Sequence, residues 1–427
     1  MLKEQARKER IGRMMSLARV YRGWNSTQLA TALGREPSRV VPVTGNPKLD
    51  LIGRLADALE WEIGEVAESL AEPTPSLGVP GLAGRSFAEL DGDAQLAHRA
   101  CDFALMEAIA LAMRSRAATA RERAMAANRL SGAYDGMGRY PRVLQCVREG
   151  LAEDRIGPDL RIMLTVNLAN ACYTLWNLEE SRAISSSLVG RFDETPPKGR
   201  LERVAQAFSL SIRGHSARRL LGHDEGDGGR MRLAHAAERD LTRAADIYEM
   251  LADEFGDDQY EGLAHTARGG AIEVSVATGT MTAEDAIHEI VERLDAAVDL
   301  AMPRSAAMLE GWGWWSVFGA NIALRSGDPR AHELAESSEF ERAVAICTNK
   351  AAEIAEHLGH WAMRERAFTL EWCRRQTPGG VRKEEARQWL LDAEDVRVLV
   401  GTMGRFPLFR PTGWAILEHA SIEEALA

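Results

Sequence analysis

Three tryptophans stand within four residues of one another, at Trp312, Trp314 and Trp315. Indole rings stack on flat or cationic ligands, so a cluster of this kind can form the wall of a binding site. The pattern of residues around Trp315 assigns that ring to packing between helices. We therefore expect Trp312 and Trp314 to contact a ligand, with packing in the core as the alternative for each.

Two groups of histidines and carboxylates have the residue types of a metal site without its spacing. Residues 223–229 place His223 beside three carboxylates, but they lack the alternating oxygen ligands and terminal glutamate of a calcium loop. His357 and His360 have no third ligand at helical spacing, which a zinc site would need. The sequence predicts no metal and no cofactor.

Motifs of the common enzyme classes do not occur in the sequence. We find no glycine-rich phosphate loop after a strand and no Gly-x-Ser-x-Gly motif. Acidic pairs such as Glu179-Glu180 and Glu384-Glu385 are neighbours on a helix surface, whereas acid–base catalysis needs two groups that face each other. The sequence favours a binding protein over an enzyme, and an enzyme with its site in the helical region remains an alternative.

The charge is distributed very unevenly along the 427 residues. Residues 1–54 carry eleven Lys and Arg against four Asp and Glu, a net charge of +7. The rest of the chain carries 41 against 59, a net charge of −18. A polyanion such as double-stranded DNA is attracted to the first part and repelled by the second. A nucleic-acid partner is therefore expected at the N-terminal end only.

The sequence from Ser26 to Leu59 predicts short helices in close succession. Ser26 is a candidate N-cap, and Leu29 and Leu33 lie on one face of the helix that follows. Gly34 is expected to end this helix with a positive φ, and Pro37 to begin the next. A helix, a glycine turn and a second helix with outward polar residues form a helix-turn-helix unit.

This stretch resembles the Xre, or Cro/repressor-type, DNA-binding domain. In that family a Gln followed by Leu-Ala opens the second helix, and Thr27-Gln28-Leu29-Ala30 stand in that place. Val40 follows Leu33 by seven residues, as in the family, and residues 51–59 repeat its closing leucine-rich run. The resemblance covers residues 11–70 and implies a domain of five helices.

The resemblance also implies which side chains meet DNA. Gln28 would bind a phosphate, Arg35 and Ser38 would face base edges or phosphates, and Arg39 is the best candidate for a guanine contact. The expected contacts to the DNA backbone are Lys48 and Arg54. The sequence departs from the family at Thr44, where Glu is usual, and at Pro42, which falls inside the expected recognition helix.

Residues 72–85 contain three prolines and three glycines, a composition typical of a linker. We accordingly divide the chain into a DNA-binding domain (1–71), a Pro/Gly linker (72–90) and a helical repeat domain (91–427). In the last, helix follows helix with short breaks, and small residues recur in a frame that resembles the tetratricopeptide repeat. One copy begins at Leu130 and returns 38 residues later at Leu168.

The predicted fold is therefore all-α: a helix-turn-helix domain followed by an α-solenoid resembling tetratricopeptide repeats. The combination resembles bacterial peptide-sensing transcription regulators, which implies a homodimer with a peptide or protein ligand in the groove of the array. The alternative is a scaffold for protein–protein interactions whose altered helix-turn-helix does not read DNA. Pro42 and Thr44 are the residues that favour this alternative.

The sequence also predicts where the protein resides. No apolar run is long enough to span a bilayer, and the charged N-terminus lacks the apolar core of a secretory signal. The five cysteines are far apart and unpaired in spacing, as expected for free thiols in a reducing compartment. We expect a cytoplasmic protein with no membrane partner.

Overall fold

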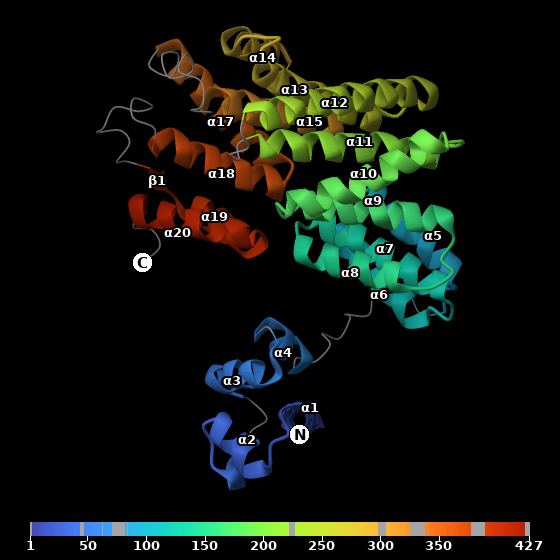
Figure 1. Cartoon of the computed structure of the whole chain (residues 1–427), viewed down its shortest axis with the longest axis vertical. Helices are drawn as coiled ribbons and strands as arrows, with labels where there is room; N and C mark the ends of the chain where they lie inside the picture. The colour runs from blue at the N-terminus through green and yellow to red at the C-terminus, as the bar shows by residue number, and fades with distance from the viewer. Residues whose placement is uncertain are drawn as a thin grey trace. The chain divides into compact units, whose positions relative to one another are not determined.

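The computed structural model describes residues 2–42, 47–61, 63–70, 82, 84–221, 227–297, 305–324, 338–376 and 389–422. The chain forms two compact units, Met1–Gly78 and Val79–Ala427. Both are helical, and the only strands among the described residues are the two short segments β1 (Leu390–Leu391) and β2 (Ser421–Ile422), which pair in parallel (Figure 1). The all-α fold class is confirmed at this level.

The first unit is a small helical domain. Its described elements are α1 (Leu2–Arg22), α2 (Ser26–Ala32), the 3₁₀ turn η1 (Pro37–Arg39), α3 (Leu49–Leu59) and α4 (Ile63–Leu70). Leu51 and Leu55 of α3 are buried against Ile11 of α1, and Leu33 of α2 joins the same core. The apolar spacing read from residues 51–59 is confirmed.

One arginine joins the end of α1 to the end of α3. Arg22 donates from Nε to the carbonyl oxygen of Ala58 at 2.8 Å and from Nη2 to that of Asp57 at 2.9 Å. It also pairs with Glu60 at 3.0 Å. Carbonyl groups in the last turn of a helix lack intrahelical partners, so Arg22 satisfies two of them and fixes how α1 crosses α3.

The second unit is a long array of helices. They are α5 (Phe87–Arg99), α6 (Phe103–Arg116), α7 (Ala120–Gly136), α8 (Tyr140–Ala152), α9 (Pro158–Thr174), α10 (Leu178–Glu194), α11 (Arg200–Leu220), α12 (Asp227–Phe255), α13 (Asp258–Thr278), α14 (Ala283–Ala297), α15 (Ala306–Leu324), α17 (Ser338–His357), α18 (Trp361–Gln376), α19 (Ala393–Arg405), the 3₁₀ turn η2 (Pro407–Phe409) and α20 (Arg410–His419).

Most of these helices are arranged in two layers. Each helix packs on the next in sequence, and in addition α5 contacts α7, α7 contacts α9, α9 contacts α11, α11 contacts α13, and α13 contacts α15, which contacts α18. These helices form what we call the inner row (α5, α7, α9, α11, α13, α15 and α18) (Figure 1). The assignment of this packing to an α-solenoid of tetratricopeptide-like repeats stays a prediction.

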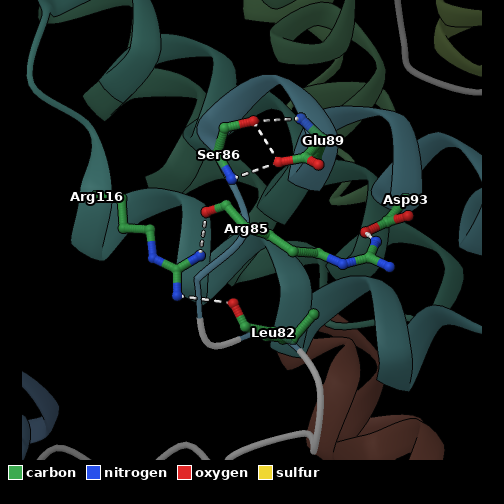
Figure 2. A network of polar contacts seen from close by, with 6 residues as sticks. All are labelled: Leu82, Arg85, Ser86, Glu89, Asp93 and Arg116. Atoms are coloured by element: carbon green, nitrogen blue, oxygen red, sulfur yellow. Dashed lines mark hydrogen bonds and ion pairs between the residues drawn. The ribbon is translucent and has the colours of Figure 1, made fainter.

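Polar contacts fix the start of the array, as Figure 2 shows. Arg116 at the end of α6 donates to the carbonyl oxygens of Arg85 and Leu82, each at 2.8 Å. Ser86 and Glu89 form a capping box at the N-terminus of α5, with Glu89 accepting from the Ser86 amide at 2.7 Å. Helix α5 thus begins inside the segment 72–90 that the sequence suggested as a linker.

Small residues allow neighbouring helices of the array to approach closely. A Cβ atom on Gly269 of α13 would lie 2.5 Å from Cδ1 of Trp315 on α15. The Trp315 Nε1 group donates to the carbonyl oxygen of His265 at 2.8 Å, which holds the ring in that position. Trp315 is 1 % exposed, so its predicted role in helix packing is confirmed.

The C-terminal helices pack back onto the turn between α7 and α8. Trp361 of α18 lies against Gly138, whose φ of +69° and lack of a side chain permit the contact. The guanidinium of Arg405 lies 3.6 Å from the centre of the Trp361 ring and donates to the carbonyl oxygen of Met137 at 3.3 Å. These contacts connect residues more than 200 positions apart and close the array on itself.

Some expectations about individual positions are wrong. The apolar spacing of Ile11, Met14, Leu17, Ala18 and Tyr21 predicts one buried face of α1. Leu17 and Tyr21 are nevertheless 54 % and 57 % exposed, because the face that packs on α3 contains Met14 and Ala18. The sequence also predicts that residues 223–230 lie between paired helices, but residues 227–230 form the start of α12. Among the described residues, no helix is long and apolar enough to cross a membrane.

A glycine-to-alanine substitution should have opposite effects on stability at Gly269 and at Gly190. Gly269→Ala forces a methyl group into Trp315, so we expect the free energy of unfolding to fall by about 1–3 kcal/mol. Gly190 lies in α10 with open space around its Cα. Gly190→Ala should raise the free energy of unfolding by up to about 1 kcal/mol, because alanine favours helix. Urea unfolding measures both, and equal effects would contradict the close approach.

Candidate functional site

Helix α2 begins one residue earlier than the sequence suggested. The N-cap is Asn25 and not Ser26: its side chain accepts from the Gln28 amide at 2.9 Å, and the Gln28 side chain accepts from the Asn25 amide at 2.9 Å. This reciprocal pair is a capping box. The side-chain Oε1 atom of Gln28 is therefore already bonded at the start of α2. Its side-chain Nε2 atom remains as a donor to a phosphate.

Gly34 ends α2 with a φ of +65°, as predicted from the sequence. The guanidinium of Arg54 from α3 lies directly over Gly34, in the space that a Cβ would take. This contact joins the turn that contains Arg35 to the exposed face of α3. Both segments were expected to contact DNA. Among the described residues, neither arginine forms an ion pair.

The expected recognition helix is much shorter than predicted. Pro37 does begin a helical element, but this element is the single 3₁₀ turn η1 that ends at Arg39. Val40 keeps helical backbone angles, but no helix continues beyond it, and Pro42 is buried. A proline lacks the amide hydrogen and crowds the preceding turn, which explains why no helix continues through this position.

The other side chains that were predicted to contact DNA differ in their exposure to solvent. Ser38, Lys48 and Arg54 are exposed, while Arg35 is half-buried. The side chain of Arg39, like residues 43–46 with Thr44, lies outside the described part of the chain. Lys48 and Arg54 flank α3, at its N-cap and in its second turn. This surface is the candidate nucleic-acid interface.

A second candidate site is a cavity on the inner row of the array. Its volume is about 170 Å³. The walls come from the end of α9, from α11, α15 and α18, and they consist of Trp176, Arg218, Arg219, Trp314, Val317, Asn321 and Arg366. Three arginines and two tryptophans thus converge on one small space, which we call the arginine cavity.

A buried ion pair forms one wall of the arginine cavity. Arg218 on α11 pairs with Glu273 on α13, and their side chains are 3 % and 0 % exposed. Asn321 on α15 donates to the same carboxylate at 3.3 Å. The Arg218 guanidinium also lies 4.6 Å from the ring centre of Phe318. Three helices of the inner row are joined through Glu273.

The other two arginines stack on aromatic rings. Arg219 lies 3.9 Å from the ring centre of Tyr173 and 4.3 Å from that of Trp176, and Arg366 lies 5.1 Å from Trp176. Burial, together with the charges of Arg218 and Arg366, lowers the pKa of Arg219 to about 10. The three guanidinium groups therefore repel one another inside the fold, and an anion between them would relieve the repulsion.

Trp176 has an unusual backbone conformation. Its φ is +66°, in the left-handed region, at the position directly after the α9 C-cap, where glycine is usual. A bulky side chain in that region is strained by about 1–3 kcal/mol. The chain thus retains an indole at a position where glycine would fit better, and that indole stacks on Arg219 and Arg366.

The two tryptophans expected to bind a ligand lie in different places. Trp314 is partly exposed and lines the arginine cavity. Trp312 is 7 % exposed and packs edge-on against His265 at a ring-centre distance of 4.1 Å, inside the core. The structure therefore places Trp314 at a cavity and Trp312 within the packing.

Trp314 connects the arginine cavity to an acidic group. Its Nε1 group donates to Glu310 at 3.3 Å. Glu310 also accepts from Nε2 of His360 at 3.2 Å, because Nδ1 of His360 accepts from the Met363 amide. Burial raises the pKa of Glu310, but His360 outweighs this effect and leaves that pKa below its usual value.

Asp135 belongs to the same acidic group. Asp135 is exposed at the end of α7. The protein groups around it still desolvate its carboxylate and raise its pKa to about 6, while the charge of His360 opposes this shift and the charge of Glu310 adds to it. A protonated His360 would neutralise only one of the two carboxylates, and a neutral His360 neutralises neither. At neutral pH the group formed by Asp135, Glu310 and His360 therefore has a net negative charge.

Few patterns in the sequence indicate this site. Arg218 and Glu273 are 55 residues apart, and Asp135 is more than 200 residues from His360. A detectable signal was the spacing of Glu310, Trp314 and Asn321, which places them on one face of α15. Polar residues on such a face indicate a wet surface inside the array.

A larger cavity of about 480 Å³ lies between α17, α18 and α19. Arg375 in its wall already pairs with Glu371 at 2.6 Å, so the geometry offers less for a ligand there. Within the described residues, no three metal-ligating side chains converge. Residues 223–226 of the acidic loop lie outside the described part of the chain.

Comparison of the sequence with protein-family models and with curated proteins finds no match in either set.

The burial of the Arg218–Glu273 pair predicts a large effect on stability. Glu273→Gln keeps the shape but removes the carboxylate charge that compensates the buried Arg218, so we expect the free energy of unfolding to fall by about 3–5 kcal/mol. Glu254 pairs with Arg203 at the surface, where the same substitution should cost less than about 1 kcal/mol. Chemical unfolding compares the two variants, and a loss at Glu273 no greater than at Glu254 would contradict the assignment.

The raised pKa of Asp135 predicts that its replacement stabilises the protein at high pH, whereas replacement of Glu273 destabilises it. Its pKa is higher in the folded protein than in the unfolded chain, so the stability that it contributes decreases as pH rises between about 4 and about 6. Asp135→Asn removes this penalty. We expect the variant to have a higher Tm than the wild type at pH 8 and an equal Tm near pH 4, measured by calorimetry. A lower Tm of the variant at pH 8 would contradict the environment assigned to Asp135.

Proposed function

We propose that the protein is a DNA-binding transcriptional regulator whose helical array senses a ligand. The first unit would bind double-stranded DNA, and the array would form a homodimer and hold the ligand on its inner row. The observation that carries this proposal is the arrangement of α2, the Gly34 turn and α3, which presents exposed basic side chains on a compact helical unit.

Electrostatics support the same assignment. The first 54 residues have a net charge of +7 in a chain whose remainder has a net charge of −18. Lys48, Arg54 and Arg35 have no acidic partner among the described residues, so their charges remain for phosphates. A protein that neutralises phosphates displaces condensed counterions, which gives DNA binding a steep dependence on salt.

A dimer would present two such units to DNA. In helix-turn-helix dimers the half-sites are about 34–36 Å apart, one turn of the duplex. A ligand that binds one arrangement of the dimer more tightly than another would shift the populations, and thereby the affinity for DNA. Regulation would follow from this difference in ligand affinity.

A scaffold that does not read DNA is the second candidate. The observation that favours it is the replacement of a recognition helix by the single turn η1, followed by the buried Pro42. One 3₁₀ turn projects fewer side chains into a major groove than a helix of two or three turns. In this case the array would bind a protein partner, and the first unit would have a structural role.

DNA binding by the full-length protein distinguishes the two candidates. We expect tighter binding to the DNA upstream of its own gene than to random DNA, and a strong loss of affinity from about 50 to about 200 mM salt. Lys48→Ala and Arg54→Ala should each reduce the slope of log affinity against log salt by about 1. Lys198→Ala, an exposed lysine of the array, is the matched control and should not change the slope.

Weak binding that is equal on both DNAs would contradict the regulator and favour the scaffold. A salt slope that is the same in the wild type and in the Lys48 and Arg54 variants would show that DNA, if bound, meets another surface.

A further inference from the structure

The arginine cavity concentrates positive charge in a chain that is mostly acidic. Its lining contains Arg218, Arg219 and Arg366 and, among the described residues, no aspartate or glutamate. The chain beyond residue 54 has a net charge of −18, so the three arginines are not part of a general basic surface. A cavity with walls of one sign of charge attracts a ligand of the opposite sign. The lining therefore favours an anion.

The nearest carboxylates compensate only part of this positive charge. Arg218 pairs with the buried Glu273. Arg366 has the carboxylate of Glu365 at 3.9 Å, which is longer than a hydrogen bond. Arg219 forms no ion pair with a described residue. Positive charge is therefore left over on Arg219 and Arg366.

Arg219 and Arg366 also keep donors for a ligand. A guanidinium group has five N–H donors. Within the described part of the chain, Arg219 uses one of them, from Nη1 to the Tyr173 carbonyl oxygen at 3.0 Å, and Arg366 donates no hydrogen bond. Both groups stack on Trp176, which restricts the orientations of their planes. Two oriented guanidinium groups with unused donors are well suited to an oxyanion.

Water alone would not relieve the repulsion between the guanidinium groups. Water molecules in the cavity would accept hydrogen bonds from the unused donors, but they carry no net charge. An anion accepts the same hydrogen bonds and also compensates the charge. Its attraction to each guanidinium is stronger inside a protein than in bulk water, because the dielectric constant is lower there.

The number and origin of the arginines favour a phosphoryl group over a carboxylate. A carboxylate has one charge and two oxygens in one plane, which a single guanidinium can satisfy through a paired contact. A phosphate monoester has a charge of about −1.5 to −2 at pH 7 and three acceptor oxygens. Arg219 comes from α11 and Arg366 from α18, so they can bind different oxygens of one phosphoryl group.

The volume of the cavity limits the size of the ligand. The cavity measures about 170 Å³ and a water molecule occupies about 30 Å³ in the liquid, so there is room for about five or six non-hydrogen atoms. This is the size of a phosphoryl group with at most a first carbon atom. Trp176, Trp314 and Val317 form an apolar part of the wall, which fits that carbon atom.

We propose that the arginine cavity binds a phosphoryl group, either of free phosphate or of a small phosphate monoester. The phosphoryl oxygens bond to Arg219 and Arg366, and the body of an ester lies on Trp314. This assignment names the ligand class of the proposed sensor and depends on that proposal for its regulatory meaning. The binding itself requires no DNA.

The strained backbone at Trp176 is an independent observation for a site. Strained residues persist where the surrounding structure holds them, and they concentrate at binding and catalytic sites. Glycine at this position would relieve the strain and still end α9. The cost of keeping tryptophan is explained if its ring positions Arg219 and Arg366 for a ligand.

Titration calorimetry on the full-length protein without DNA, at constant ionic strength, tests the proposal. The probes are inorganic phosphate, methyl phosphate, phenyl phosphate, acetate and succinate. We expect at least one phosphoryl probe to bind at least about tenfold more tightly than either carboxylate, because its charge and its oxygens match two guanidinium groups. The tightest probe also identifies the source: inorganic phosphate would indicate the free ion, and either ester would indicate a monoester.

Variants locate the binding. Arg219→Gln and Arg366→Gln should each weaken binding of the tightest phosphoryl probe at least about tenfold. Arg182→Gln changes an exposed arginine on α10 and is the control that should bind as the wild type does. Circular dichroism shows whether each variant is folded. Where a glutamine variant does not fold, the lysine variant keeps the charge but loses the planar set of donors, and it should also bind more weakly than the wild type.

Three results would overturn the proposal: no heat from any phosphoryl probe, a carboxylate that binds as tightly as the best phosphoryl probe, or full affinity in the folded variants of Arg219 or Arg366. Because the assay contains no DNA, its failure is separate from a failure of the regulator, which the DNA titrations measure.

Discussion

The helical array depends on the buried ion pair between Arg218 and Glu273. Two charges inside a protein are stable only when each compensates the other, so the pair fixes the distance between α11 and α13. The bond from Asn321 extends this constraint to α15. A guanidinium held at this depth makes the surrounding space positive, and Arg219 and Arg366 add to that potential. The pair therefore links the stability of the inner row to the chemistry of the arginine cavity.

Closure of the array is the second constraint. The contact of Trp361 with Gly138, together with Arg405, brings the C-terminal helices onto the α7–α8 turn. The same approach places His360, at the start of α18, near Asp135, at the end of α7. An open solenoid would leave these residues apart. The acidic group beside Trp314 thus follows from a closed arrangement of helices.

Local patterns in the sequence predicted the helices well. They could not predict contacts between residues that are distant in the sequence. The spacing of Leu51 and Leu55 predicted α3, and Gly34 predicted the end of α2. Both features depend only on residues within about one helical turn. The capping box of Asn25 was also detectable, since a Gln follows it at the third position. Pro37 and Pro42 together suggested a recognition helix that is two turns long or kinked, whereas the structure has only the single turn Pro37–Arg39. The pairing of Arg218 depends on tertiary packing, which no local pattern records.

The most direct test of the account is to observe the tryptophans themselves. With fluorinated tryptophan incorporated throughout the protein, single Trp→Phe variants assign the fluorine resonances of Trp176, Trp314 and Trp24, the last of which lies in the first unit. On addition of the phosphoryl probe that binds, we predict shifts of the Trp176 and Trp314 resonances and no shift of Trp24. Unchanged resonances of Trp176 and Trp314, in a protein that binds the probe, would contradict the assignment of the arginine cavity as the ligand site.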